Sequence, residues 1–289
     1  MSDCRAIRKL SEDTRTAFVL GGGGSLGATQ VGMLRELLAQ SIRPDMVVGV
    51  SAGAINGAFF AHQPTLDCLE MLASLWAGVT TRVALGLGWG SLLGVLGLRD
   101  YVGNPAGLRS ILQRNLSYRS FHETAVPLHV LCAERQTGRA VALSDGHIID
   151  AVLACTAIPG VFPAVKIAGR WLVDGAVASR TPIETAIRLG ATRLFVLPCG
   201  ATSADEESVS GGALSHAIHA INLMAARTLR CDFERFSNDA VIHIVPPPAV
   251  DCKSYDYSHG RELIDRARES TRLWLDGGLS ASLTTAAAS

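Results

Sequence analysis

The chain of 289 residues lacks a net charge, because 26 basic side chains balance 26 acidic ones. This balance gives no electrostatic basis for nucleic-acid binding. The sequence also lacks the uninterrupted apolar run of about twenty residues that a membrane-spanning helix requires. Its N-terminal stretch is too charged to hold the apolar core of a signal peptide, so export by that route is not expected.

The seven cysteines are scattered and form no Cys-x-x-Cys pair, and their number is odd. A disulfide framework or a zinc site would need paired cysteines at short spacing. We therefore expect most of them to be buried apolar residues in a reducing compartment. Together with the missing export signal, this pattern predicts a cytoplasmic protein.

Hydrophobic residues make up 48% of the chain, which also holds 29 glycines, and this composition suits a tightly packed sheet covered by helices. Strands are expected at residues 17–21, 47–50, 128–132, 140–143, 193–197 and 241–245, with a hairpin at 164–173. Helices are expected at 28–40, after Ser51, and at 64–77, 104–115, 148–155, 182–189, 213–236 and 260–275. The alternation predicts a three-layer α/β/α fold with a mainly parallel central sheet.

No internal repeat or change of composition marks a domain boundary in this chain. We expect a single domain over residues 1–289, whose sequence motifs fall at about 17–200. The helices and strand of 213–275 should pack on that part. The polar stretch 201–212 is expected to be a solvent loop, and the tail after residue 278 is expected to be loose.

The stretch from Val47 to Phe60 holds the strongest chemical signal in the chain. Four apolar residues precede Ser51, as in a buried parallel strand, and small apolar residues follow it at helical spacing. Residues 49–53 match G-x-S-x-G, the strand-to-helix turn that presents a serine hydroxyl at the edge of a sheet. Matches of this length also arise by chance in glycine-rich chains, but the strand-then-helix context makes Ser51 the leading candidate for a nucleophile.

A run of four glycines lies between the first expected strand and the helix that follows it. Such a run exposes successive backbone amides, so Gly22, Gly23 and Gly24 are candidate donors to an oxyanion formed in acyl transfer. Two of these glycines, together with Gly27, also satisfy the dinucleotide-binding pattern G-x-G-x-x-G. That pattern requires an acidic residue at the end of the second strand, where this chain has Ser51, so a nucleotide cofactor is disfavoured.

A serine nucleophile also needs a base that accepts its proton. Among the eight histidines, His259 is the least implausible member of a Ser-His-Asp triad. Asp174 is the better candidate, because it follows an apolar strand and precedes a glycine, and so should project from a tight turn rather than into the core. Asp145 and Asp276 also precede glycines, and spacing alone does not separate these three carboxylates.

Together these residues resemble the patatin-like phospholipase family. The likeness rests on the order of three blocks: the glycine run, the serine turn, and Asp174-Gly175-Ala176, which matches the D-G-G/A motif of the family. Residues 154–163 also resemble the A-S-x-A-x-P-x-x-F-P segment of the family. The likeness covers roughly residues 17–200 and implies a patatin-like α/β fold.

The resemblance implies a lipid acyl hydrolase with a Ser51–Asp174 dyad, no catalytic histidine, and an oxyanion hole made by the amides of the glycine run. The substrate would be a fatty-acyl ester, cleaved through an acyl-serine intermediate without a metal or cofactor. Many members carry Arg or Lys two residues after the glycine run, where this chain has Leu26, and this difference bears on phospholipid preference more than on ester hydrolysis. The alternative is a lipid- or nucleotide-binding regulator that keeps the fold without turnover.

Residues 83–98 are apolar but are interrupted by five glycines. We favour a buried or covering loop for this segment. The alternative is a mobile flap or a surface that dips into a membrane interface near the active site, where it could also shelter an acyl chain.

Overall fold

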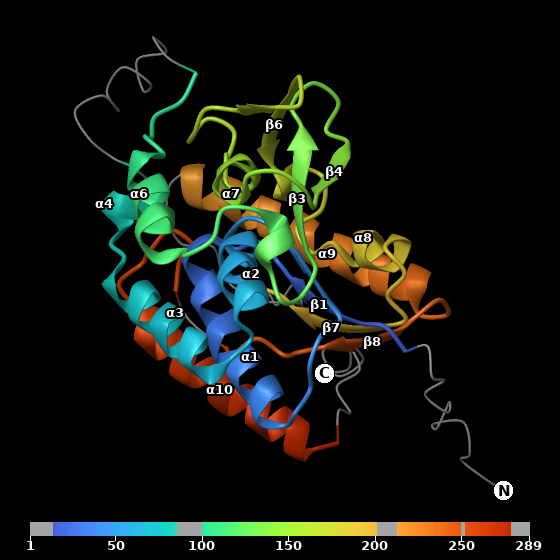
Figure 1. The fold of residues 1–289 in the computed structure, drawn as a ribbon. Coiled ribbons are helices and arrows are strands. Elements are labelled where there is room, and N and C mark those ends of the chain that lie inside the picture. The colour runs from blue at the N-terminus through green and yellow to red at the C-terminus, as the bar shows by residue number, and fades with distance from the viewer. Residues whose placement is uncertain (1–13, 85, 87–99, 201–212, 250–251, 279–289) are drawn as a thin grey trace, which may run out of the picture.

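The computed structural model describes residues 14–84, 86, 100–200, 213–249 and 252–278. At its centre lies a mixed, mainly parallel sheet with helices on both faces, which is the three-layer α/β/α class expected from the sequence (Figure 1). The expected solvent loop at 201–212, the tail after residue 278 and nearly all of the 83–98 segment lie outside the described residues.

The described sheet has eight strands in the order β5-β6-β3-β2-β1-β7-β8, with β4 paired to β3. Strands β1, β2, β3, β7 and β8 run parallel to one another, whereas β4, β5 and β6 pair in antiparallel fashion. Their bounds are β1 Thr16–Leu20, β2 Met46–Gly49, β3 Leu128–Glu134, β4 Ala140–Leu143, β5 Val165–Ile167, β6 Arg170–Asp174, β7 Arg193–Leu197 and β8 Val241–Ile244. The expected strands, including the hairpin, are confirmed with ends shifted by at most two residues.

The expected helices are also confirmed. Their bounds are α1 Ala28–Ala39, α2 Ala52–His62, α3 Leu66–Gly78, α6 Ala106–Asn115, α7 Ile148–Cys155, α8 Ile183–Arg188, α9 Ala213–Phe236 and α10 Gly260–Asp276, with a short α4 at Thr81–Ala84. Short 3-10 turns occur at η1 Gly24–Gly27, η2 Phe121–Glu123 and η3 Gly175–Val177. Among the described residues, no helix is long and apolar enough to span a membrane.

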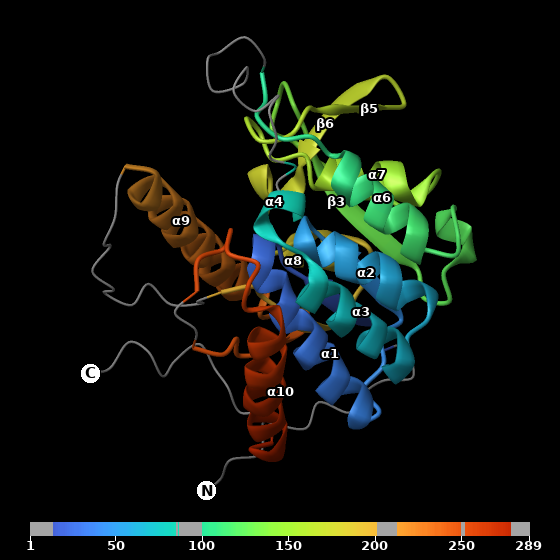
Figure 2. The ribbon, with the colours of Figure 1, turned by 90° about the vertical axis from the view of Figure 1, so that its left-hand side faces the viewer.

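The central strand β1 is buried along its whole length and sends alternate side chains to opposite faces of the sheet. Phe18 and Leu20 join a core built with α1, α2, α3, α7 and α10. Ala17 and Val19 join a second core, which α8 and α9 cover. Figure 2 shows α10 alongside α1 on the first face, with α9 standing apart from them. Burial on both faces explains why this strand reads as a continuous apolar run.

The pairing of the strands determines which loops meet. Strands β1 and β2 are parallel neighbours, so the glycine run after β1 and Ser51 after β2 lie at the same edge of the sheet. Strand β6 pairs with β3 and places Asp174 opposite Cys132. Three segments that are distant in the sequence therefore converge at the carboxyl ends of the parallel strands, where ligand sites of α/β sheets form.

Candidate active site

Ser51 lies in the sharp turn between β2 and α2 and has a positive φ of 52°. Such a conformation of a non-glycine residue costs about 1 to 3 kcal/mol and persists only where the surrounding contacts enforce it. The Val50 amide donates to the Leu20 carbonyl at 3.0 Å, and the Ser51 carbonyl accepts from the Ala54 amide at 2.9 Å. At Gly53 a Cβ would lie 2.1 Å from the Leu20 oxygen, so this glycine allows α2 to approach β1. The G-x-S-x-G stretch therefore forms the expected turn.

Asp174 ends β6 and is buried, with 2% of its surface exposed. The Ser51 hydroxyl donates to Asp174 Oδ2 at 2.7 Å, and the Ala176 amide donates to Asp174 Oδ1 at 2.8 Å. The expectation that this carboxylate projects away from the core is wrong. The turn packs inward because Gly175 lies against β3, where a Cβ would come within 1.9 Å of the Leu131 oxygen.

The surroundings of Asp174 change its acidity in two opposing ways. Burial raises the pKa of this carboxyl to about 6, because the charged form loses hydration. Hydrogen bonds from Ser51 and Ala176, and the charge of Arg180, stabilise the carboxylate and lower the pKa. The group is therefore mainly ionised at neutral pH and is a stronger base than an exposed aspartate.

Cys155, at the end of α7, contacts the backbone of Ser51. The Ser51 amide donates to Cys155 Sγ at 3.0 Å, and the thiol donates to the Leu131 carbonyl at 2.9 Å. Burial raises the pKa of this thiol well above its ordinary value, so it stays neutral. The sequence analysis included Cys155 only as part of a family-like segment and assigned it no role at the site. Cys68, Cys132 and Cys199 are buried as expected, whereas Cys231 is exposed.

Arg180 holds the glycine run after β1 in place. The Gly22 amide donates to the Arg180 carbonyl at 2.9 Å, and Arg180 Nε donates to the Gly22 carbonyl at 2.8 Å. The Gly22 amide is therefore occupied, which corrects its assignment as an oxyanion donor. The amides of Gly23 and Gly24 have no acceptor among the described residues, and the same holds for Ala52 at the start of α2. Sequence reasoning missed the Ala52 amide, although the first amides of a helix lack partners within it.

A buried network of side-chain amides supports the same loop from the other side. Gln30 Nε2 donates to the Gly21 carbonyl at 2.9 Å and to the last carbonyl of β7 at 2.8 Å. Asn56 Nδ2 donates to Gln30 Oε1 at 2.9 Å and to the Gly27 carbonyl at 2.8 Å, while Asn56 Oδ1 accepts from Trp76 Nε1 at 2.8 Å. Both amide side chains are fully buried, and all their donors and acceptors have partners.

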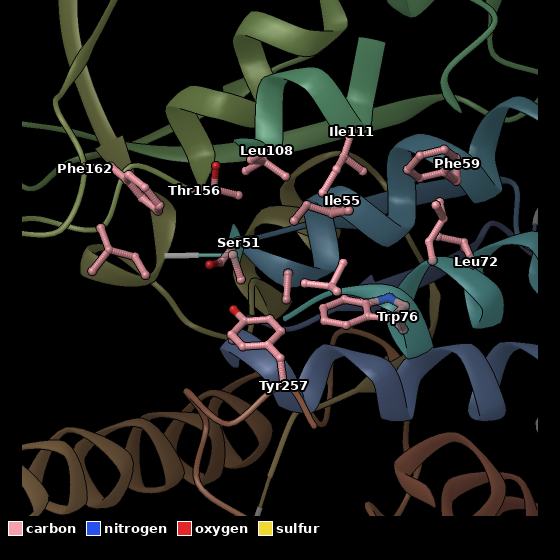
Figure 3. Close-up of a pocket in the computed structure, with 16 residues that line it drawn as sticks. Ser51, Ile55, Phe59, Leu72, Trp76, Leu108, Ile111, Thr156, Phe162 and Tyr257 are labelled. Atoms are coloured by element: carbon pink, nitrogen blue, oxygen red, sulfur yellow. The ribbon is translucent and has the colours of Figure 1, made fainter. Parts of the chain in front are cut away.

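A cavity of about 90 Å³ lies beside Ser51 (Figure 3). Its lining is apolar apart from three hydroxyl-bearing side chains, those of Ser51, Thr156 and Tyr257. Ile55 and Phe59 follow Ser51 at intervals of four residues on α2, so the cavity extends along this helix for about 12 Å, at about 1.5 Å per residue. Further apolar lining residues are Leu72 and Trp76 of α3, Leu108 and Ile111 of α6, and Phe162.

The structure tests the expected contribution of residues 83–98 to this cavity only at their start. The expected shelter for an acyl chain was the segment 83–98, of which only residues 83, 84 and 86 belong to the described part of the chain. Ala84 of that segment lines the cavity, and half of the lining residues come from α2, α3 and α6. Their apolar residues recur at helical spacing, and that signal is the same for a residue that faces a cavity and for one that packs in the core.

The three rival candidates for a base lie elsewhere. His259 immediately precedes α10, and its ring nitrogens lie 3.5 Å from an Asp256 oxygen and 3.2 Å from a Glu262 oxygen. Asp145 is exposed and pairs with His122. Asp276 is exposed at the end of α10. The structure thus brings Asp174, rather than His259, Asp145 or Asp276, into contact with Ser51. No cluster of three or more His, Cys, Asp or Glu side chains that could hold a metal ion occurs in the described part of the chain.

The fold and the site define an α/β protein with a serine at a strand-to-helix turn and a buried carboxylate within hydrogen-bond distance of its hydroxyl. The profile of the family described as patatin-like phospholipase matches residues 18–187. The chain belongs to this family, whose members are typically lipid acyl hydrolases.

Two individual proteins are also similar to this chain in sequence. Patatin-like phospholipase domain-containing protein 7 of Rattus norvegicus is 25% identical over 216 residues, which are 74% of this chain and 16% of the relative. Neuropathy target esterase sws of Drosophila melanogaster is 23% identical over 201 residues, which are 69% of this chain and 14% of the relative. The chain thus spans less than a fifth of the length of these relatives.

Two solved structures resemble the fold at low identity. The crystal structure of VipD from Legionella pneumophila has a TM-score of 0.46 and 12% identity, and the match covers 89% of this chain and 66% of that one. The ExoU-SpcU complex of Pseudomonas aeruginosa has a TM-score of 0.42 and 16% identity, covering 93% of this chain and 52% of the other.

Proposed function

We propose that this protein is a serine acyl hydrolase that cleaves fatty-acyl esters of lipids, with Ser51 as nucleophile and Asp174 as general base. One observation carries the proposal: the Ser51 hydroxyl donates to a buried carboxylate at 2.7 Å and also lines an apolar cavity. Membership of the patatin-like phospholipase family supports a lipid ester as the substrate. The apolar lining around Ile55 and Phe59 suits an acyl chain.

The reaction proceeds in two steps. Asp174 accepts the hydroxyl proton while Ser51 Oγ attacks the ester carbonyl, and the amides of Gly23, Gly24 and Ala52 are available to the oxyanion. Collapse of the tetrahedral intermediate breaks the bond to the alcohol, which leaves with the proton from Asp174. Water then attacks the acyl-serine and loses its proton to Asp174. Collapse of the second tetrahedral intermediate breaks the bond to Ser51 Oγ, which takes the proton back from Asp174, and the fatty acid is released.

A fluorophosphonate probe tests the proposal directly. An activated serine reacts with the probe and an ordinary turn serine does not, so the protein should be labelled, and mass spectrometry should locate the adduct at Ser51. The Ser51→Ala variant should remain unlabelled. If the native protein binds lipid vesicles but Ser51 stays unmodified, the non-catalytic alternative replaces the proposal.

The pH dependence of hydrolysis should follow the ionisation of Asp174. A general base works only as the carboxylate, so kcat/KM should fall about tenfold per pH unit below about pH 6 and reach a plateau above about pH 7. Initial rates on a soluble octanoyl ester between about pH 5 and pH 8 measure this profile. A rate that stays constant through pH 6, with the protein folded throughout, would contradict the assignment.

Cys155 should affect turnover through the backbone of Ser51. Cys155→Ala removes the acceptor of the Ser51 amide, and losing one hydrogen bond of about 1 to 1.5 kcal/mol should lower kcat about tenfold with little change in KM. Cys155→Ser keeps a donor and an acceptor, so its kcat should be within about threefold of the native value. Cys68→Ala is the matched control, because that cysteine is buried but bonds to the Phe59 carbonyl. Equal losses in the alanine and serine variants would rule out this positioning role.

A further inference from the structure

The three hydroxyl groups that line the cavity differ in their hydrogen bonds. The Ser51 hydroxyl donates to Asp174, and the Thr156 hydroxyl donates to the Val152 carbonyl at 2.9 Å. The Tyr257 hydroxyl has no hydrogen-bond partner among the described residues. Tyr257 is partly exposed, so water can accept from this hydroxyl, and an oxygen of a bound molecule can take the place of that water. The hydroxyl is therefore a donor that a molecule in the cavity can use.

The segment that carries Tyr257 is anchored to the catalytic loop. The Ser25 amide donates to the Ser254 carbonyl at 2.8 Å, and the Ser25 hydroxyl donates to the Lys253 carbonyl at 3.1 Å. Ser25 belongs to η1, directly after the glycine run. Thr81 adds a second anchor, because its hydroxyl donates to the Tyr255 carbonyl at 3.2 Å. Tyr257 is thus supplied by a part of the chain that the family profile, which ends at residue 187, does not reach.

The ring of Tyr257 is held in one orientation. It stacks on Trp76 with ring centroids 6.2 Å apart and an interplanar angle of 5°. Trp76 is itself bound to Asn56, so the stacking surface is anchored in the buried amide network. In Figure 3 the hydroxyl end of Tyr257 faces Ser51, whereas Phe59 and Leu72 lie at the far end of the cavity.

The charge state of Tyr257 suits a donor. Burial raises the pKa of its hydroxyl to about 12, so the group keeps its proton at neutral pH. The cavity lining contains no charged side chain among the described residues, so the partner of this donor is best matched by an uncharged oxygen.

We propose that Tyr257 is a substrate-binding residue whose hydroxyl donates a hydrogen bond to an oxygen of the alcohol part of the ester. The acyl chain has its place along α2 toward Phe59, so the alcohol part lies at the opposite side of Ser51, near the tyrosine hydroxyl. The inference rests on the proposed hydrolase function and adds to it a residue that selects for the alcohol. Glycerol is the simplest lipid alcohol that carries such oxygens beside the ester bond.

Tyr257→Phe tests this role, because it removes one oxygen and keeps the ring that stacks on Trp76. Three octanoyl esters with the same acyl chain are compared: a monoacylglycerol, a lysophosphatidylcholine and an ethyl ester. The variant should lose about 10- to 100-fold in kcat/KM on both glycerol esters and less than about threefold on the ethyl ester, which has no further oxygen. The rates of the native protein on the two glycerol esters distinguish a neutral glyceride from a phospholipid as the source of the glycerol group.

Tyr255→Phe is the matched control. It lies two residues away on the same segment, does not line the cavity, and should leave all three rates within about twofold. Equal losses of Tyr257→Phe on the three esters, or no loss on any, would overturn the inference. Labelling of Ser51 by the fluorophosphonate probe, in the native protein and in Tyr257→Phe, separates the two proposals. If the native protein is not labelled and hydrolyses none of the esters, the hydrolase function itself is refuted. If the variant is labelled but its losses do not depend on the ester, only the role of Tyr257 is refuted.

Discussion

Ser51→Ala and Asp174→Asn should each lower kcat on a fatty-acyl ester by about four orders of magnitude or more, while the protein remains folded. The alanine removes the atom that attacks the ester. The asparagine fills the same space and can still accept from the Ala176 amide, but it cannot take a proton from the serine. Since the two residues act as a unit, the double variant should be hardly worse than either single one.

Two controls make this result specific. His259→Ala should change kcat by less than about twofold, because its ring lies with Asp256 and Glu262 rather than with Ser51. Asp145→Asn alters an exposed Asp-Gly turn away from Ser51 and should be equally silent. Full activity in either dyad variant would refute the mechanism, and a His259→Ala variant as inactive as Ser51→Ala would establish a Ser-His-Asp triad in its place.

Gln30→Met should lower the free energy of unfolding by about 2 to 4 kcal/mol. The change keeps the length of the side chain but removes its bonds to the Gly21 carbonyl, the end of β7 and Asn56. One Asn56 donor is then buried without an acceptor, and that desolvation is the largest part of the cost. Equilibrium unfolding in urea, followed by circular dichroism, measures the change.

Gln113→Met on α6 is the control for this stability prediction. Gln113 is exposed, so the same chemical change should alter the free energy of unfolding by less than about 0.5 kcal/mol. A loss of less than about 1 kcal/mol for Gln30→Met would show that the amide network is not important for stability.

Much of the architecture was predictable because local patterns reflect local physics. Burial of β1 on both faces requires an apolar run, and the turn at Ser51 requires glycines where α2 approaches β1. The strands and helices follow from such patterns with ends shifted by a few residues. The packing of α10 against α1 was less accessible, because an amphipathic helix does not indicate which partner covers its apolar face.

The candidate site, too, could be predicted from the sequence only in part. Ser51 and Asp174 were singled out from their local contexts, and the structure brings their side chains into contact. The Gly22 amide was assigned to the oxyanion because a glycine run exposes amides, but the carbonyl of Arg180 occupies it. Cys155 and Tyr257 were missed as site residues, because a buried cysteine and an aromatic residue near a helix are more often part of a core than of a site.

The sequence by itself determined the turn that strains Ser51, the order of the strands and helices along the chain, and a short list of carboxylates that could serve as its partner. Only the tertiary structure decided among Asp145, Asp174 and Asp276, because Ser51 and Asp174 are 123 residues apart and meet through the pairing of β6 with β3. It also decided that an apolar cavity with one unpaired phenol adjoins this serine in the described part of the chain. Turns and helix faces depend on neighbouring residues, whereas contacts between distant segments depend on how the whole sheet is assembled.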